Sequence, residues 1–149
     1  MPPDAVFRLP SPVSLLHVAL NRLRSGPSTA LSCRMVTHKD LDAWKVSREI
    51  VAVPLRLSRE RWHPWAAALF SQALRATLSV QLNIAEGYAF GPSPTRTRHY
   101  RIAYGSAVET GELCDHLVET GILDTAGAEV LLGLSLRSRE LCWGLVRAE

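Results

Sequence analysis

The sequence predicts an all-α protein, an antiparallel up-down four-helix bundle that follows a flexible N-terminal extension. Apolar residues recur every three or four positions along four separate stretches, which is the spacing of one helix face. Capping residues and prolines stand where these stretches begin, and the short connections make consecutive helices neighbours. No stretch of the sequence shows sustained polar–apolar alternation, and no Asn-Gly or Asp-Gly hairpin dipeptide occurs.

Residues 1–35 are predicted to lie outside the folded domain, which we place at residues 36–149. The extension is rich in proline, serine and arginine and offers little apolar surface to a core. Two interpretations stay open. Translation starts at or near Met35 and the preceding residues come from an over-extended reading frame, or these residues form a basic arm that contacts nucleic acid.

The first helix is predicted from about Leu41 to Leu57, with Asp40 capping its start. Pro54 lies inside the repeat, where a proline removes a backbone donor and crowds the preceding turn at a cost of about 3 kcal/mol. We therefore expect the helix to kink or to end near Val53. The predicted inward face comprises Ala43, Val46, Ile50, Val53 and Leu57.

The second helix is predicted to begin at Pro64, a favoured first-turn residue, and to stop at Gly87, where a left-handed cap forms easily. A loop over residues 88–93 then leads to the third helix, which Ser93 caps and Pro94 opens. The predicted inward residues of the second helix are Leu69, Ala73, Ala76, Val80 and Ile84.

The third helix is expected to extend to about Thr120 and to end at Gly121. Asp124 caps the fourth helix, which continues to the C-terminus. The predicted inward residues are Tyr100, Ala103, Ala107, Cys114 and Leu117 on the third helix and Leu131, Leu134, Leu141 and Leu145 on the fourth.

The net charge of +3 lies entirely in residues 1–34, because the rest of the chain holds 13 basic and 13 acidic side chains. Nucleic-acid binding by the folded part therefore requires a local basic patch. No apolar run approaches the roughly 18–20 residues of a membrane span. Cys33, Cys114 and Cys142 form no CxxC pair, which favours free thiols in a reducing cytoplasm.

The candidate nucleic-acid-binding residues gather at the start of the third helix. Positive charge there opposes the helix dipole, so it does not serve helix stability and suggests contact with phosphate. The alternative is a solvated surface with salt bridges. The candidates are Arg96, Arg98, His99 and Arg101, with Arg75 on the second helix adding further charge.

Asn83 and Glu86 are polar residues near the end of a largely apolar helix. They either face a ligand or partner, or tie the helix end to the following loop while Gly87 supplies the turn; the second interpretation is favoured. Gly105 and Ser106 are interpreted as small residues that let two helices approach closely.

No catalytic residue, metal site or cofactor is predicted, because the chain has no HExxH, GxSxG or glycine-rich phosphate motif. Glu112, Asp115 and Glu119 share one helix, whereas di-metal sites in bundles draw carboxylates from several helices. A small metal-dependent enzyme and a purely structural adaptor stay open as alternatives to an interaction protein.

Five segments together resemble the bacterial family of 23S rRNA intervening-sequence proteins, over roughly residues 36–147. They are Asp40–Trp44 (DLDAW), Ser71-Gln72, Arg75-Ala76, Asn83–Gly87 (NIAEG) and Ile102–Ser106 (IAYGS). The family is similar to the accessory proteins of diversity-generating retroelements.

This resemblance implies a ring-shaped homopentamer with a non-enzymatic role that binds RNA or a reverse transcriptase. Leu74 and the pair Tyr88-Ala89 stand where members often carry arginine, so this chain has less positive charge at those positions. The expected protein is therefore a cytoplasmic, self-assembling four-helix bundle without cofactor.

Overall fold

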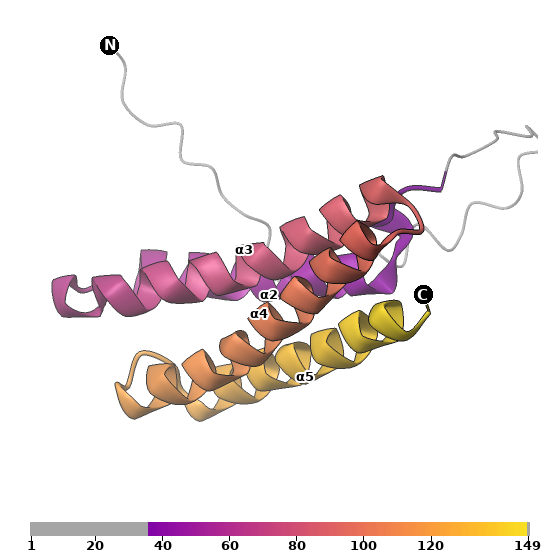
Figure 1. The fold of residues 1–149 in the computed structure, drawn as a ribbon. Helices are drawn as coiled ribbons and strands as arrows, with labels where there is room; N and C mark the ends of the chain where they lie inside the picture. Colours follow the sequence, from indigo (N-terminus) through magenta and orange to yellow (C-terminus); the bar gives the residue numbers. More distant parts are fainter. Residues whose placement is uncertain (1–35, 149) are drawn as a thin grey trace, which may run out of the picture. The chain divides into compact units, whose positions relative to one another are not determined.

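The computed structural model describes residues 36–148, so the prediction for residues 1–35 lies outside the described part. Four long helices form the bundle, and no strand occurs within the described range (Figure 1). This confirms the predicted all-α bundle. The helices are α2 (Asp42–Glu60), α3 (Ala67–Phe90), α4 (Pro94–Glu119) and α5 (Thr125–Arg147), with short 3₁₀ helices at His38–Asp40 and Pro64–Ala66.

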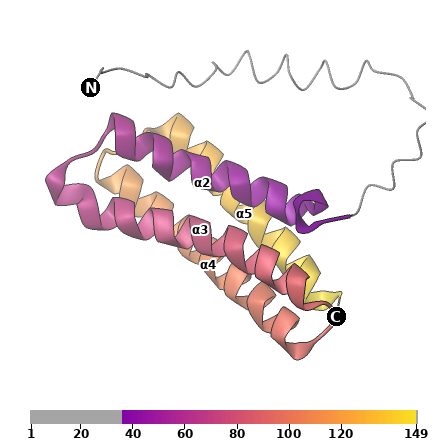
Figure 2. The same cartoon turned by 90° about the horizontal axis from the view of Figure 1, so that it is seen from above.

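Each helix packs against the next in the chain, and α2 also packs against α5, which closes the bundle. Figure 2 shows the two resulting layers, with α2 and α3 over α5 and α4. Two hydrogen-bonded pairs, Ser79–Ser106 and Asn83–His99, join α3 to α4. The later residue of α3 pairs with the earlier residue of α4, so these two helices are antiparallel.

The core consists mainly of two apolar clusters. One holds the larger side chains, among them Ile50, Phe70 and Leu117. The other combines Val80 and Ile84 of α3 with small residues of the other helices, among them Ala103 and Ala107 of α4, which allow close helix packing. Among residues 36–148, no helix combines the length and the apolar character needed to cross a bilayer.

Local capping chemistry explains where α4 and α5 begin. The Ser93 hydroxyl accepts a hydrogen bond from the Arg96 backbone N–H at 3.2 Å, and the Asp124 carboxylate accepts one from Gly127 at 2.8 Å. Gly121 has a φ of 69° just after α4, a backbone conformation that favours glycine. These predicted boundaries are confirmed.

The predicted cap of the first helix is wrong. Asp40 belongs instead to the preceding 3₁₀ helix, where its carboxylate accepts a hydrogen bond from the Thr37 backbone N–H at 2.8 Å. The N-cap of α2 is Leu41, which makes no side-chain cap. Of the two alternatives predicted at Pro54, a kink or an early end near Val53, the early end is wrong, because α2 continues through Pro54 to Glu60.

The predicted end of α3 at Gly87 is wrong as well. The helix continues to Phe90, and Gly91, with a φ of 62°, follows its last residue. Gly87 lies buried inside α3, where an added Cβ would sit 2.5 Å from Cε1 and 2.8 Å from Cδ1 of Tyr100. The glycine is therefore needed for a close approach between α3 and α4, and the connection shortens to residues 91–93.

Candidate functional site

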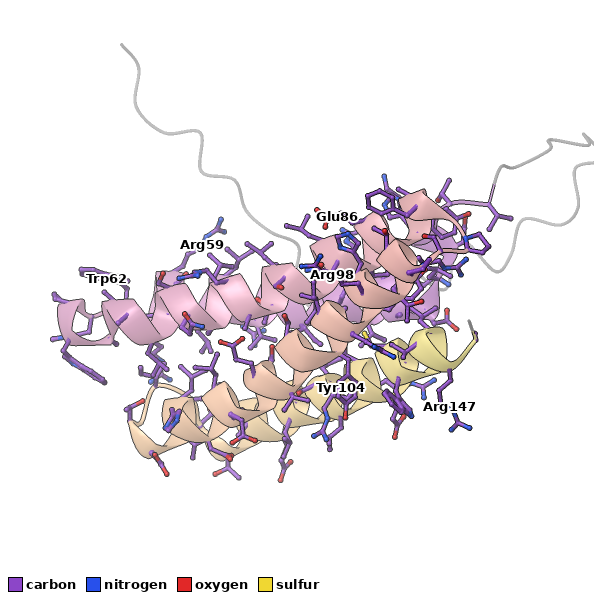
Figure 3. The ribbon with its side chains drawn as sticks, in the orientation of Figure 1. Arg59, Trp62, Glu86, Arg98, Tyr104 and Arg147 are labelled. Atoms are coloured by element: carbon purple, nitrogen blue, oxygen red, sulfur yellow. The ribbon has the colours of Figure 1, made fainter. Side chains whose placement is uncertain are left out.

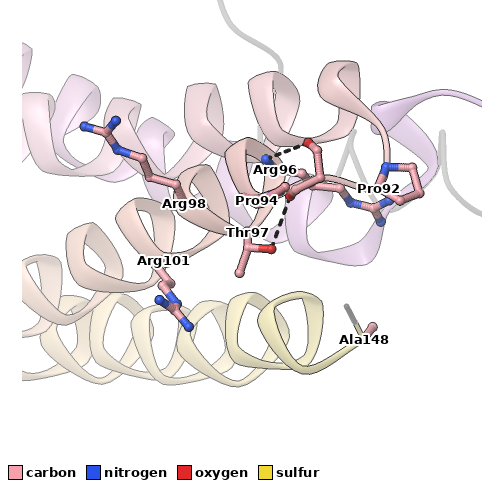
Figure 4. Close-up of a pocket in the computed structure, with 8 residues that line it drawn as sticks. Pro92, Pro94, Arg96, Thr97, Arg98, Arg101 and Ala148 are labelled. Atoms are coloured by element: carbon pink, nitrogen blue, oxygen red, sulfur yellow. Dashed lines mark hydrogen bonds between the residues drawn. The ribbon is translucent and has the colours of Figure 1, made fainter.

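The start of α4 presents three arginines within its first two turns. The Ser93 cap and Pro94 fix where the helix begins, and this places Arg96, Arg98 and Arg101 around the same helix end. All three line an open depression of about 760 Å³ that extends from the α3–α4 connection to Ala148, just beyond α5. Figure 4 shows the Arg101 side chain directed toward α5 and the Arg98 side chain directed away from it.

The three arginines differ in their surroundings. Arg96 is half-buried, and its guanidinium carbon lies 5.4 Å from the ring centroid of Tyr100, a cation–π contact. Arg98 and Arg101 are exposed. Neither forms an ion pair with any carboxylate within residues 36–148. We define Arg98 and Arg101 as the arginine pair.

His99 does not join the arginine pair, although the sequence grouped them. Its Nδ1 lies 2.9 Å from the Asn83 side-chain oxygen and 3.1 Å from the Glu86 carboxylate. The imidazole also stacks on Phe90, with ring centroids 5.3 Å apart and planes 11° from parallel. His99 therefore faces α3, and its hydrogen bonds hold α3 and α4 together.

Asn83 and Glu86 thus contact His99 of the neighbouring helix α4. The favoured interpretation, in which they tie the helix end to the following loop, is wrong. The Asn83 amide also donates to the Ser79 backbone carbonyl at 2.9 Å, and the Ser106 hydroxyl donates to the Ser79 hydroxyl at 2.8 Å. These contacts form a continuous polar connection along the α3–α4 contact. Such a connection fixes the register of the two helices because each member satisfies another.

Gly105 does not lie in a helix–helix contact of this chain, and Arg75 does not lie beside the arginines of α4. Gly105 is exposed, and an added Cβ would meet nothing within 4 Å, so it does not bring two helices of this chain together. Arg75 is exposed on α3, eleven positions before Glu86 and therefore about 16 Å from it along the helix axis. Arg75 is thus separate from the α4 cluster.

A second surface was not identified from the sequence. Tyr104 on α4 and Trp143 on α5 lie with ring centroids 5.5 Å apart and line a depression of about 250 Å³. Figure 3 shows Tyr104 between the α4 and α5 ribbons. A sequence signal exists, because Arg139, Trp143 and Arg147 are spaced four residues apart and share one face of α5.

The described cysteines are structural rather than reactive. Cys114 and Cys142 are both free, as predicted, and both are buried. Burial raises the pKa of the Cys142 thiol to about 11, and burial followed by the charge of Asp115 raises the pKa of Cys114. Between residues 36 and 148, no three His, Cys, Asp or Glu side chains gather closely enough to hold a metal ion.

Comparison with known proteins adds one finding to this geometry. A protein-family model described as "23S rRNA-intervening sequence protein" matches residues 39–140, about two thirds of the chain and most of the bundle. The resemblance identified from the sequence is thereby confirmed. No curated protein matches the chain.

Proposed function

Since the chain belongs to the family of 23S rRNA-intervening sequence proteins, we propose that it is a non-enzymatic RNA-binding protein that assembles into a closed homopentamer. RNA binding rests on the arginine pair, and assembly rests on an apolar outer surface of α3 and α4. Each part has its own test, so one can fail without the other.

The observation that supports RNA binding is the unpaired charge of Arg98 and Arg101. Both guanidinium groups are exposed and lack a carboxylate partner among the described residues. Both lie beyond the first turn of α4, where the helix dipole acts only weakly, so their charge has no partner in the helix end either. A phosphate group placed there pairs with the guanidinium groups through charge-assisted hydrogen bonds.

The test measures RNA affinity by fluorescence anisotropy as a function of salt. We expect the double variant Arg98→Glu/Arg101→Glu to bind RNA more weakly than the unchanged protein. The plot of the logarithm of the binding constant against the logarithm of the salt concentration should become shallower by about 1.4 in slope. Each lost phosphate contact on a single strand removes about 0.7 from the magnitude of this slope.

The matched control is Arg56→Glu/Arg59→Glu, which makes the same charge change at two exposed arginines of α2. This control should retain most of the affinity and the original slope. Equal loss of affinity in both double variants would mean that net charge alone matters and would contradict the assignment to α4.

The observation that supports assembly is an apolar outer surface where α3 meets α4. The exposed fractions are 55% for Leu82 and 40% for Ile102, and the register of Ser79 with Ser106 brings these two positions opposite each other. Gly105 lies one turn after Ile102 with open space beside it. A mid-helix glycine costs about 1 kcal/mol, and close contact with a second chain provides a reason for it.

The corresponding test is the oligomeric state of Ile102→Glu. A buried, unpaired carboxylate at a subunit contact is costly, so this variant should dissociate into smaller species in native mass spectrometry. Val118→Glu is the control, since Val118 is also 40% exposed and lies about 24 Å further along α4. An intact pentamer in Ile102→Glu would refute the proposed contact.

A further inference from the structure

The outer groove between α4 and α5 carries two aromatic rings, Tyr104, which is partly buried against the core, and Trp143. Trp143 is 48% exposed, although tryptophan side chains usually bury most of their surface. Its ring lies against Tyr104 at 5.5 Å between centroids, with the planes inclined by 49°. The two tilted rings form an aromatic surface that is partly open to solvent, which we call the platform. The depression beside them, about 250 Å³, is also lined by Leu136, Arg139 and Glu140.

Cationic side chains flank this platform on both helices. Arg139 precedes Trp143 by four residues and Arg147 follows it by four, so all three share one face of α5. Arg101 precedes Tyr104 by three residues on α4. Figure 3 shows Tyr104 between the α4 and α5 ribbons and Arg147 near the C-terminal end of α5.

The charge in the groove is largely uncompensated. Within the described part of the chain, Arg101, Arg139 and Arg147 form no ion pair. The acidic group beside the platform, Glu140, is paired with Arg137 at 3.0 Å and so contributes little negative field. The groove thus combines an aromatic surface with positive charge on both of its sides.

We propose that the α4–α5 groove binds single-stranded RNA, with a base stacked on the Tyr104–Trp143 platform and the flanking phosphates at Arg101, Arg139 and Arg147. This inference rests on the proposed RNA-binding function and specifies the form of RNA that it takes. Arginine-lined grooves with exposed aromatic rings bind single strands because every base offers a face for stacking. Arg101 belongs both to this groove and to the arginine pair, whereas Arg98 is directed away from α5 (Figure 4).

Single-stranded RNA fits the groove better than a duplex does. Bases in a duplex are already stacked and paired, so the platform could reach them only after unpairing. The depression at the platform is also smaller than the roughly 300–1,000 Å³ of small-molecule sites. A site of this size accommodates one group that projects from a longer chain rather than a whole ligand.

The test compares the affinities of an unstructured oligouridine and of a duplex of the same length by fluorescence anisotropy. Trp143→Leu keeps an apolar side chain but removes the stacking surface, so the Kd for oligouridine should rise by about 5- to 150-fold. Trp143→Phe should restore most of the affinity. The duplex Kd should change little in either variant.

Trp62→Leu is the matched control, because Trp62 is 59% exposed and Figure 3 places it at the opposite end of the bundle from Arg147. This variant should bind oligouridine as the unchanged protein does. Native mass spectrometry of Trp143→Leu should show an unchanged oligomer, and circular dichroism an unchanged helix content.

Three results would overturn the inference in distinguishable ways. If Trp143→Leu binds oligouridine normally while Arg98→Glu/Arg101→Glu loses it, the platform is not a binding site but the RNA-binding function stands. If Trp143→Leu dissociates the oligomer, a second copy of the chain occupies the groove. If the unchanged protein binds neither RNA, the proposed function fails and the inference fails with it.

Discussion

Replacing Gly87 by alanine tests the close packing of α3 against α4, where Gly87 lies next to the ring of Tyr100. Gly87 is buried, and a Cβ at this position would lie 2.5 Å and 2.8 Å from two ring carbons of Tyr100 and 3.3 Å from the Arg96 carbonyl oxygen. Tyr100 has no exposed surface, so its ring has no free direction in which to move. The substitution therefore forces the two helices apart or displaces the ring.

The expected magnitude follows from two opposing effects. Alanine in place of a mid-helix glycine raises the free energy of unfolding by about 0.8–1.0 kcal/mol, whereas overpacking a filled core lowers it by about 1–3 kcal/mol. Because the clash is with a buried ring and a backbone oxygen, we expect the upper part of that range. Gly87→Ala should therefore lose about 1–2 kcal/mol of stability.

Gly133→Ala is the control, because it measures the stability gained from the higher helix propensity of alanine without a steric clash. Gly133 lies in the interior of α5, where an added Cβ meets nothing within 4 Å, so this variant should gain about 1 kcal/mol. Both free energies come from urea unfolding followed by far-ultraviolet circular dichroism at one protein concentration. If Gly87→Ala gains as much stability as Gly133→Ala, then Tyr100 does not pack against Gly87 and the reasoning is wrong.

Three further predictions concern buried polar groups. Ser79→Ala and Ser106→Ala should each lower the unfolding free energy by about 1 kcal/mol, because each removes the same 2.8 Å hydrogen bond between the two hydroxyl groups. The double variant should therefore lose less than the sum of the two single losses, and strict additivity would contradict this. Tyr100→Phe should raise the unfolding free energy by about 1 kcal/mol, since the Tyr100 hydroxyl is buried without a hydrogen-bond partner among residues 36–148; a loss of stability in urea unfolding would argue against it. Because burial raises the pKa of Cys142 from 9.0 to about 11, the unfolded chain loses this proton first as pH rises. Stability should then fall from near pH 9 toward pH 11, and Cys142→Ala should lack this part of the fall in parallel unfolding curves.

The parts of the fold that depend on residues close together in the chain could be predicted from the sequence. The starts of α4 and α5 are fixed by Ser93 and Asp124, whose side chains bond backbone groups only three positions away. The inward faces followed the helical period, so Ile50, Val80 and Leu117 are all buried as expected. Family membership was likewise predictable, because its motifs are short segments of sequence.

The errors at Pro54 and Gly87 share one physical cause, which is packing between segments distant in the sequence. At Pro54 the local cost of about 3 kcal/mol predicts a break, but burial of Val53 and Leu57 on either side supports the helix through it. Gly87 has the residue type of a cap, and only the Tyr100 ring from the next helix explains why it lies mid-helix instead.

The candidate site was only partly visible in the sequence for the same reason. Arg96, Arg98 and Arg101 are close in the chain, and they line one depression. His99 lies among them in sequence, yet its contacts with Asn83 and Glu86 turn it toward α3. The Tyr104–Trp143 platform joins residues that are 39 positions apart, so the spacing of Arg139, Trp143 and Arg147 marks one face of α5 but does not show that the two rings meet.

Native mass spectrometry of the protein purified without nuclease treatment reports the number of subunits and any bound RNA in one experiment. We expect a pentamer that carries additional mass, and treatment with ribonuclease should remove that mass. The double variant Arg98→Glu/Arg101→Glu should give the pentamer without the additional mass. A monomer or dimer with no bound RNA would contradict both the assembly and the RNA-binding function.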